Sequence, residues 1–476
     1  MLSVKITLAA PLATVALFCL TSPPEFPSSS NSTSSVTFNR DVAPILYEHC
    51  AMCHNPNDLA PFSVLTYKDV RPWARSIREK VITREMPPWY ADPRYGRFKN
   101  DSRLTKNDID TIAAWADHGA REGDPKDLPP IPAYVLGWRI GEPEQVFSMT
   151  EDYTVKPDDP DKYVYFVVPA EFNEDKWVQA AEIRPGNRKV VHHIIAHILT
   201  PQAMAGARGG GAQLDRQAEN EPAIFYKQGG LGRVKADAPV IDDGANAPNG
   251  GAVFKRRVGE EGSDLFSVLL TSYAPGKNPD IFAPGMAKRI PAGSKIVFQI
   301  HYSTFRGSLE KPQRDRTSVG LIYAKEPPAK RVVTLTVPNH FFKIPARADY
   351  HEVTAAYTFD QDVQLIDYMP HMHLRGKDMK YEVIYPNGKR ETLLWVPNFN
   401  FNWQALYSLT EPVAIPKGAR LIITAHFDNS SKNKYNPDPN KPVRWGDPTY
   451  DEMMIGWMDY AAPNPYKRDT APKRVR

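Results

Sequence analysis

Cysteine is scarce in this chain, which has only three among its 476 residues. Cys19 lies in an apolar N-terminal stretch, so only Cys50 and Cys53 are left for everything that follows. Two thiols this close in sequence serve a local purpose, and an exported protein of this kind would then have no structural disulfide. We therefore expect packed cores and bound cofactors to stabilise the fold.

A large excess of either charge is also missing. The 59 Lys and Arg residues nearly balance the 55 Asp and Glu residues, and the formal net charge is +4. This net charge is too weak to suggest nucleic acid as a partner. The length suggests about three domains, and the 45 prolines favour turns and loops over long helices.

A long hydrophobic run is missing as well. The apolar stretch at residues 6–20 is shorter than the roughly 20 residues that a membrane-spanning helix needs. Lys5 precedes it, a pattern typical of a signal peptide, which we assign to residues 1–21, followed by a Ser- and Pro-rich linker at 22–36. We therefore expect a periplasmic or otherwise exported, bacterial protein. No clear cleavage site is visible, so an uncleaved N-terminal membrane anchor stays the alternative.

Residues 50–54 read Cys-Ala-Met-Cys-His, the C-x-x-C-H pattern of c-type haem attachment. Two thiols on one turn can add to the two vinyl groups of a haem, and the imidazole of His54 can ligate its iron. A zinc site would need a second ligand pair nearby, and a thioredoxin-like dithiol would need a βαβ setting. The segment resembles a small monohaem cytochrome c domain. We place that domain at residues 37–125, with one covalent haem c held by Cys50, Cys53 and His54.

We predict Met86 as the second axial ligand of the haem. Pro87 and Pro88 follow it and form a rigid loop after the preceding helix. A thioether ligand at this position would raise the reduction potential of the haem. His118, at the end of the last helix, is the competing candidate, whereas Met52 lies inside the attachment turn and is badly placed.

The last helix of this segment has clear sequence limits. Thr105 and Asp108 predict a capping box at its start, and Gly119 suits its C-terminal cap. One apolar stripe is expected to pack in the core of the domain, and it consists of Ile109, Ile112, Ala113 and Ala116.

The hydrophobic pattern changes to a period of two after a linker at residues 126–150. Five segments predict strands: 163–168, 295–301, 332–337, 351–359 and 420–427. Closely spaced turn residues favour antiparallel, jelly-roll-like sandwiches, which we place at 151–325 and 326–476. The predicted fold class is therefore multidomain, with a small all-α cytochrome c domain followed by two all-β sandwiches. Residues 202–264, rich in Gly, Ala and charge, predict a long surface insertion.

Histidines cluster in this β-rich part. His371 and His373 lie two apart, so both imidazoles would face one side of a strand and could share zinc, copper, iron or nickel. His192 and His193 are adjacent, and they could share an ion only if a bulge or twist re-aims one of them. His193 and His197 offer a rival pairing at helical spacing, and the pattern alone does not choose between the two.

Four motifs occur in a fixed order, namely Val191-His192-His193, Gln299-Ile300-His301-Tyr302, His371-Met372-His373 and Asp451-Glu452-Met453. Over residues 181–460 this order resembles the copper type II, ascorbate-dependent monooxygenases, the family of peptidylglycine α-hydroxylating and dopamine β-monooxygenases. The resemblance implies two sandwiches that hold one copper ion each. The electron-transfer copper would be bound by His192, His193 and His301. The copper that activates oxygen, the catalytic centre, would be bound by His371, His373 and Met453.

A thioether ligand at Met453 is consistent with a copper site, because a thioether binds zinc poorly and Cu(I) well. On the sequence pattern alone, Met453 would be a core residue. The chain departs from the family at two substrate-binding positions: Met369 replaces an arginine that holds a peptide carboxylate in amidating enzymes, and Trp457 replaces a tyrosine. The identity of the substrate therefore does not transfer.

The combined patterns predict a haem- and copper-containing monooxygenase. It would hydroxylate a small-molecule or peptide-like substrate with O2 and would take electrons from a periplasmic donor through its haem. The alternative is a periplasmic electron-transfer or copper-binding protein without hydroxylase activity.

Overall fold

The structure is a computed structural model that describes residues 36–56, 58, 60–132, 137–159, 162–201, 252–254, 268–303, 309–446 and 449–466. The predicted signal peptide and nearly all of the linker after it lie outside these residues, as does most of the predicted insertion at 202–264. Within that insertion the structure describes β6 (Ala252–Phe254), a strand that the sequence pattern did not predict. No described helix is both long enough and apolar enough to cross a bilayer.

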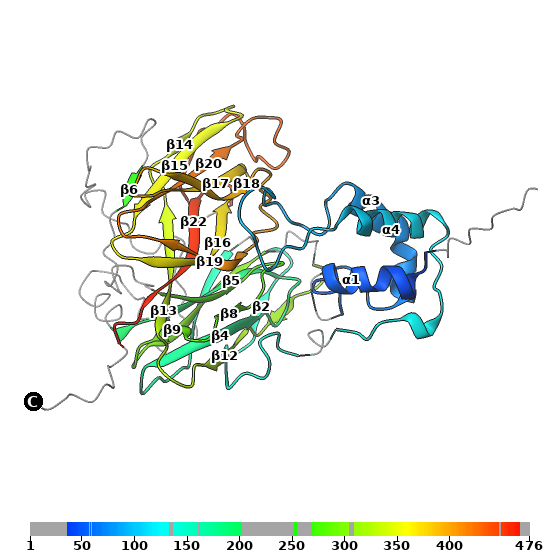
Figure 1. Ribbon diagram of the computed structural model, residues 1–476, viewed down its shortest axis with the longest axis horizontal. Coiled ribbons are helices and arrows are strands. Elements are labelled where there is room, and N and C mark those ends of the chain that lie inside the picture. The colour runs from blue at the N-terminus through cyan, green and yellow to red at the C-terminus, as the bar shows by residue number, and fades with distance from the viewer. Residues whose placement is uncertain are drawn as a thin grey trace, which may run out of the picture. The chain divides into compact units, whose positions relative to one another are not determined.

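The N-terminal part of the described chain is helical, and its core is formed by its own residues. Its elements are η1 (Phe38–Val42), α1 (Ala43–His49), α2 (Tyr67–Val70), η2 (Arg71–Trp73), α3 (Ala74–Ile82), α4 (Lys106–Asp117) and η3 (Pro125–Asp127). Helices α3 and α4 lie side by side (Figure 1). The predicted capping box of Thr105 and Asp108 is confirmed, and Gly119 has a φ of +92° just after the helix. Ile112 of the predicted stripe is fully buried. Trp115, which the stripe did not include, is also fully buried.

The next part folds into two packed sheets. Its strands are β1 (Gln145–Ser148), β2 (Tyr153–Val155), β3 (Lys162–Val168), β4 (Lys176–Arg184), β5 (Val191–Leu199), β7 (Val268–Tyr273), β8 (Asp280–Ile281), β9 (Met286–Ile290), β10 (Lys295–Tyr302), β11 (Gln313–Asp315) and β12 (Ser318–Tyr323). One sheet has the order β3-β10-β5-β7, and β1-β12-β4-β9 belongs to the other. On β10 the predicted alternation holds, because Ile296, Phe298 and Ile300 all point into the core and are fully buried. β1 lies inside the predicted linker at 126–150, where Phe147 is buried in the same core.

The C-terminal part repeats this two-layer plan. Its strands are β13 (Lys330–Pro338), β14 (Lys343–Ile344), β15 (His351–Thr358), β16 (Val363–Met372), β17 (Gly376–Ile384), β18 (Arg390–Val396), β19 (Tyr407–Ile415), β20 (Arg420–Phe427), β21 (Val443–Arg444) and β22 (Met454–Pro463). One layer contains β13-β22-β16-β19, and the other has the order β18-β17-β20-β15-β6. All five predicted strands are present, displaced by at most two residues at either end.

The two sandwiches share one sheet. β9 pairs in parallel with β13, through Met286 with Lys330 and Ala287 with Arg331, so the sheet β1-β12-β4-β9-β13-β22-β16-β19 is continuous. This arrangement differs from the two separate sandwiches that the sequence predicted. A period-two pattern shows which face of a strand is buried, but it does not show which strand pairs beyond the edge.

A segment after α3 packs against the C-terminal sandwich. Phe98 forms a β-bridge with Leu409 on β19, and Lys99 N donates to Ser408 O at 2.9 Å. The side chain of Asn100 adds two hydrogen bonds to this contact. Its Nδ2 donates to Leu406 O at 2.6 Å, and its Oδ1 accepts from Ser408 N at 3.0 Å. The segment therefore covers the outer edge of the continuous sheet, an edge that would otherwise be open to pairing.

Candidate metal centres

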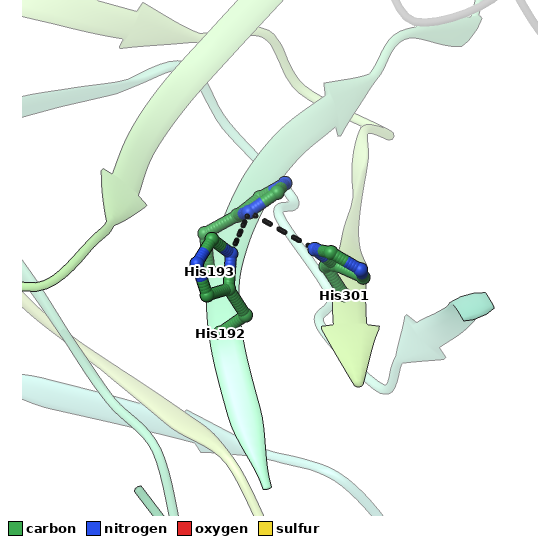
Figure 2. Close-up of side chains that lie close together, drawn as sticks. All are labelled: His192, His193 and His301. Atoms are coloured by element: carbon green, nitrogen blue, oxygen red, sulfur yellow. Dashed lines mark hydrogen bonds between the residues drawn. The ribbon is translucent and has the colours of Figure 1, made fainter. Parts of the chain in front are cut away.

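Three histidines meet where β5 lies beside β10. Val191 is paired with Tyr302 and His193 with His301, so His192 is the extra residue of a β-bulge. A bulge turns its strand locally and re-aims a side chain. This is the condition under which adjacent histidines can face the same point, and Figure 2 shows the imidazoles of His192, His193 and His301 turned toward one another.

The three imidazoles lie within coordination distance of a single ion. Their ligand atoms are all within 4.8 Å of one another, and this is the one such group of three or more His, Cys, Asp or Glu residues among the described residues. The Nδ1 atoms of His192 and His193 are 3.0 Å apart, and those of His301 and His193 are 3.4 Å apart. Tyr163 on β3 stacks on His301, with ring centroids 4.5 Å apart and planes 10° apart. The cluster therefore has a rigid aromatic support on one side.

Burial and the neighbouring imidazoles of His301 and His192 hold the pKa of His193 well below its ordinary value. A neutral imidazole is the form that ligates a metal. Three imidazoles of this kind suit copper, zinc, iron or nickel.

His197 does not belong to this centre. β5 is a strand and not a helix, so four residues separate His193 from His197 by about 13 Å along the chain. The Nε2 atom of His197 lies 3.4 Å from Gln299 Oε1, and burial lowers its pKa to about 4. The rival pairing at helical spacing is therefore wrong, and His197 is a core residue.

A second centre lies on one face of β16 and β22. In the register, His371 is opposite Ile455 and Met372 is opposite Met454. Met372 and Met454 are fully buried in the core, so His371 and Ile455 belong to the other face. His373 directly follows β16 and Met453 directly precedes β22, and continued alternation would put both on that same face. The imidazole centroids of His371 and His373 are 5.4 Å apart.

Both imidazoles of this pair are oriented through their Nδ1 atoms. His371 Nδ1 lies 2.6 Å from Gln404 Oε1, and His373 Nδ1 lies 3.3 Å from Asp451 O. Since a carbonyl oxygen only accepts, each Nδ1 carries the proton and each Nε2 keeps its lone pair for a metal. Burial lowers the pKa of both groups, that of His373 to about 3, so both are neutral.

The segment just before β22, which contains Met453, is held by a buried carboxyl group. The side chain of Glu452 is fully buried and accepts from the backbone N of His373 at 2.8 Å, of Arg375 at 2.7 Å and of Met453 at 3.2 Å. Burial raises the pKa of Glu452 to about 8. Through these three contacts, one side chain fixes the spacing between the two strands that form the centre.

The C-x-x-C-H segment folds into one compact turn. Cys53 N and His54 N donate to Cys50 O at 3.1 and 2.9 Å, which places the three side chains on one turn. Both thiols are free. His54 Nδ1 lies 3.1 Å from Phe62 O, so its Nε2 is available for iron. These residues fit a covalently attached haem c.

The two candidates for the second haem ligand differ in burial. Met86 is half-buried, and its backbone N donates to Lys80 O at 3.2 Å. His118 is exposed at the C-terminal cap of α4. Met86 as the axial ligand therefore stays a prediction.

Comparison with known proteins identifies the C-terminal region. Residues 336–470 match the family described as copper type II ascorbate-dependent monooxygenase, C-terminal domain. This stretch contains His371, His373 and Met453. The matched region is thus a copper-dependent monooxygenase domain, which makes the chain an oxidoreductase. No curated protein matches the chain.

Similarities to solved structures are faint. PNGF-II shares 11% identity over 67% of this chain and 66% of that chain, with a TM-score of 0.26. T=1 particles derived from infectious bursal virus share 10% identity over 68% and 70%, with a TM-score of 0.17. The mavirus major capsid protein shares 8% identity over 72% and 92%, with a TM-score of 0.18. Scores this low carry no argument about fold or function.

Sequence reasoning missed the residues that support the ligands. Gln404 and Phe401 belong to none of the four motifs, and Glu452 lies inside one of them without a predicted role. The one visible signal is the alternation of amides and aromatic residues at 398–403, Asn-Phe-Asn-Phe-Asn-Trp, which precedes Gln404 directly.

Proposed function

We propose that this protein is an exported haem- and copper-containing monooxygenase that hydroxylates an organic substrate. The observation that carries the proposal is the convergence of His192, His193 and His301, two of them 108 positions apart in sequence, into one cluster. Together with the Met453-containing face of the matched domain, it provides two candidate copper centres of different composition.

The net reaction would be R–H + O2 + 2e⁻ + 2H⁺ → R–OH + H2O, and its two electrons must arrive singly. His192, His193 and His301 would hold the copper that passes electrons, and His371, His373 and Met453 would hold the copper at which O2 is activated. Bound copper supplies one-electron chemistry at both centres, and a haem on Cys50, Cys53 and His54 supplies a reversible one-electron carrier. The protein's own contribution is orientation: Gln404 and the Asp451 carbonyl keep both Nε2 atoms of the second centre directed at the ion.

The attachment loop contacts the sandwich that carries the first centre. Asp58, shortly after Cys53, forms an ion pair with Arg188, which lies just before β5 and its histidines. Both side chains are largely buried, with 15% and 18% of their surface exposed. This contact supports a route for electrons from the haem segment to the first centre. The donor would be ascorbate or a periplasmic electron carrier.

The face beside the second centre indicates the class of substrate. Met369 and Trp457 are opposite each other in the register and share the face of His371 and Ile455. This wall is apolar where amidating enzymes have an arginine and a tyrosine. A substrate with an apolar group at the reacting carbon fits such a wall, and a free carboxylate does not.

The test is reoxidation of the haem by O2. Copper-loaded protein is reduced anaerobically and mixed with O2 while the haem absorbance is followed. We expect rapid reoxidation of the loaded protein and slow reoxidation of copper-free protein. Met453→Ala should abolish the rapid phase and leave the haem spectrum unchanged. Equal rates with and without copper would contradict the proposal.

A second candidate is a periplasmic electron-transfer or copper-binding protein without hydroxylase activity. The absence of a charged anchor at Met369 and Trp457 favours it, because no described residue of that wall would fix a polar substrate. Uptake of O2 that is coupled to a hydroxylated product, with a panel of apolar compounds, separates the two candidates. Copper loading without such uptake would favour the second.

A further inference from the structure

The loop between β18 and β19 contacts ligands of both centres. The Phe401 ring stacks on His192 of the first centre, with centroids 5.4 Å apart and planes 19° apart. The same ring meets His373 of the second centre edge-on, with centroids 6.0 Å apart and planes 85° apart. One phenyl ring therefore lies between the imidazoles of His192 and His373. The centroids of these imidazoles are no farther apart than the sum of the two distances.

Four hydrogen bonds hold this ring in place. Gln404 Nε2 donates to Phe401 O at 3.3 Å, and the same side chain accepts from His371 Nδ1. Asn400 Nδ2 donates to the hydroxyl of Tyr90 at 3.2 Å, and Asn400 Oδ1 accepts from Asn402 N at 3.0 Å. Tyr90 belongs to the segment that covers the sheet edge. The loop is thus fixed from the ligand side and from the N-terminal side at once.

We propose that Phe401 is the positioning residue that couples the two centres. This inference rests on the proposed function. One electron would leave Cu(I) at the first centre, which becomes Cu(II), and would reduce Cu(II) at the second centre to Cu(I), with no bond or proton transferred. Packed atoms carry an electron between two sites better than a gap or loosely held water does. A phenylalanine ring is not oxidised by copper, so it serves as a packed bridge and holds no electron itself.

The Phe401 ring occupies part of the space between the two sets of histidines. Replacement of Phe401 by Ala would open a cavity of about the volume of that ring. The two phenylalanines of the alternating segment 398–403 thus have different places. Phe399 packs on the core of the C-terminal sandwich, and Phe401 packs between the two sets of histidines.

The test compares Phe401→Ala with Phe399→Leu, a matched control in the same loop. Copper-loaded, oxidised protein is mixed with less than one equivalent of ascorbate, and freeze-quench EPR follows the two Cu(II) signals. In the wild type and in Phe399→Leu, both signals should fall together. In Phe401→Ala, one signal should fall first and the other should lag by roughly tenfold or more, since packed atoms are replaced by a gap. Equal equilibration in all three proteins, at equal copper content, would overturn the proposal.

A metal-free readout separates this proposal from the proposed function. In copper-free protein, the ring current of Phe401 should shift the imidazole proton resonances of His192 and His373, and Phe401→Leu should remove both shifts together. If Phe401→Leu removes both shifts but the wild-type chain takes up no copper, the packing of Phe401 against both sets of histidines stands, whereas the oxygenase and the electron coupling are refuted. The absence of either shift in wild-type protein would refute the bridge itself.

Discussion

At the scale of single residues, the hydrogen-bond partner decides what an imidazole can do. His371 and His197 both lie on strands and both have a glutamine neighbour. Gln404 accepts from Nδ1 of His371 and leaves the lone pair of its Nε2 for a metal, whereas Gln299 lies against Nε2 of His197 in the core. The first arrangement presents a metal ligand, and the second satisfies a buried polar group.

Gln404→Ala should therefore weaken copper binding at the second centre alone. The change removes the acceptor that fixes the His371 ring, and losses of this kind reduce metal affinity by about 10–100-fold. Competition titration with a copper chelator measures the affinity of each centre. Gln299→Ala is the matched control and should leave both affinities unchanged. An unaltered second centre in Gln404→Ala would show that the hydrogen bond does not orient the ligand.

At the scale of elements, the strands themselves were predictable and their irregularities were not. Alternation at 295–301 and 420–427 predicted β10 and β20 closely, since one face of each strand is packed in a core. The bulge at His192 depends on the register with β10, which no local pattern encodes. The two adjacent histidines indicated a bulge only on the assumption that both bind one ion, because on a regular strand they would face opposite sides. Gln404 and Phe401 could not be predicted as site residues for a similar reason. The histidines that they contact lie far from them in sequence.

The shared sheet contains a buried ion pair at the junction of the sandwiches. Lys288 on β9 is 1% exposed, and its Nζ lies 2.9 Å from Asp459 Oδ2 on β22 and 2.9 Å from Thr334 Oγ1 on β13. The charge of Asp459 keeps the pKa of Lys288 above its ordinary value despite the burial. The pair therefore links strands of both sandwiches.

Lys288→Met should destabilise the fold by about 3–5 kcal/mol, because Asp459 would stay buried without its partner. Urea unfolding followed by circular dichroism measures the loss. Lys389→Met, which breaks an exposed pair with Glu391, should change the free energy of unfolding little. A Lys288 variant as stable as that control would mean that the junction does not depend on the pair.

Asp367, in the same network, predicts a dependence of stability on pH. Burial and the charges of Asp459 and Asp280 raise the pKa of Asp367 well above its ordinary value. The folded state therefore holds a proton that the unfolded chain releases above about pH 4, and this contribution to stability is lost as the pH rises through the folded pKa. Asp367→Asn should flatten the decline in the free energy of unfolding toward alkaline pH, as measured by urea titrations across pH. A variant with the same pH slope as the wild type would refute the assignment.

At the scale of the whole molecule, the N-terminal helical part contacts both sandwiches. The ion pair of Asp58 and Arg188 reaches the first sandwich, and the segment around Phe98 adds to the sheet edge of the second. The resemblance in sequence predicted two copper-binding sandwiches, and the match over residues 336–470 supports the second of them. It could not predict these contacts, since they lie outside the motifs. Under the proposed function, these contacts would link the C-x-x-C-H segment to the two sets of histidines in one electron route.

The most direct test of this account is the metal content of the full chain, measured together with its Cu(II) EPR and haem spectra. We expect one haem and two coppers per chain, with two distinguishable Cu(II) signals. His301→Ala should remove only the signal of the first centre, and Met453→Ala should alter only that of the second. A chain that binds no copper, or whose copper survives both substitutions unchanged, would contradict the central claim that these side chains form two copper centres.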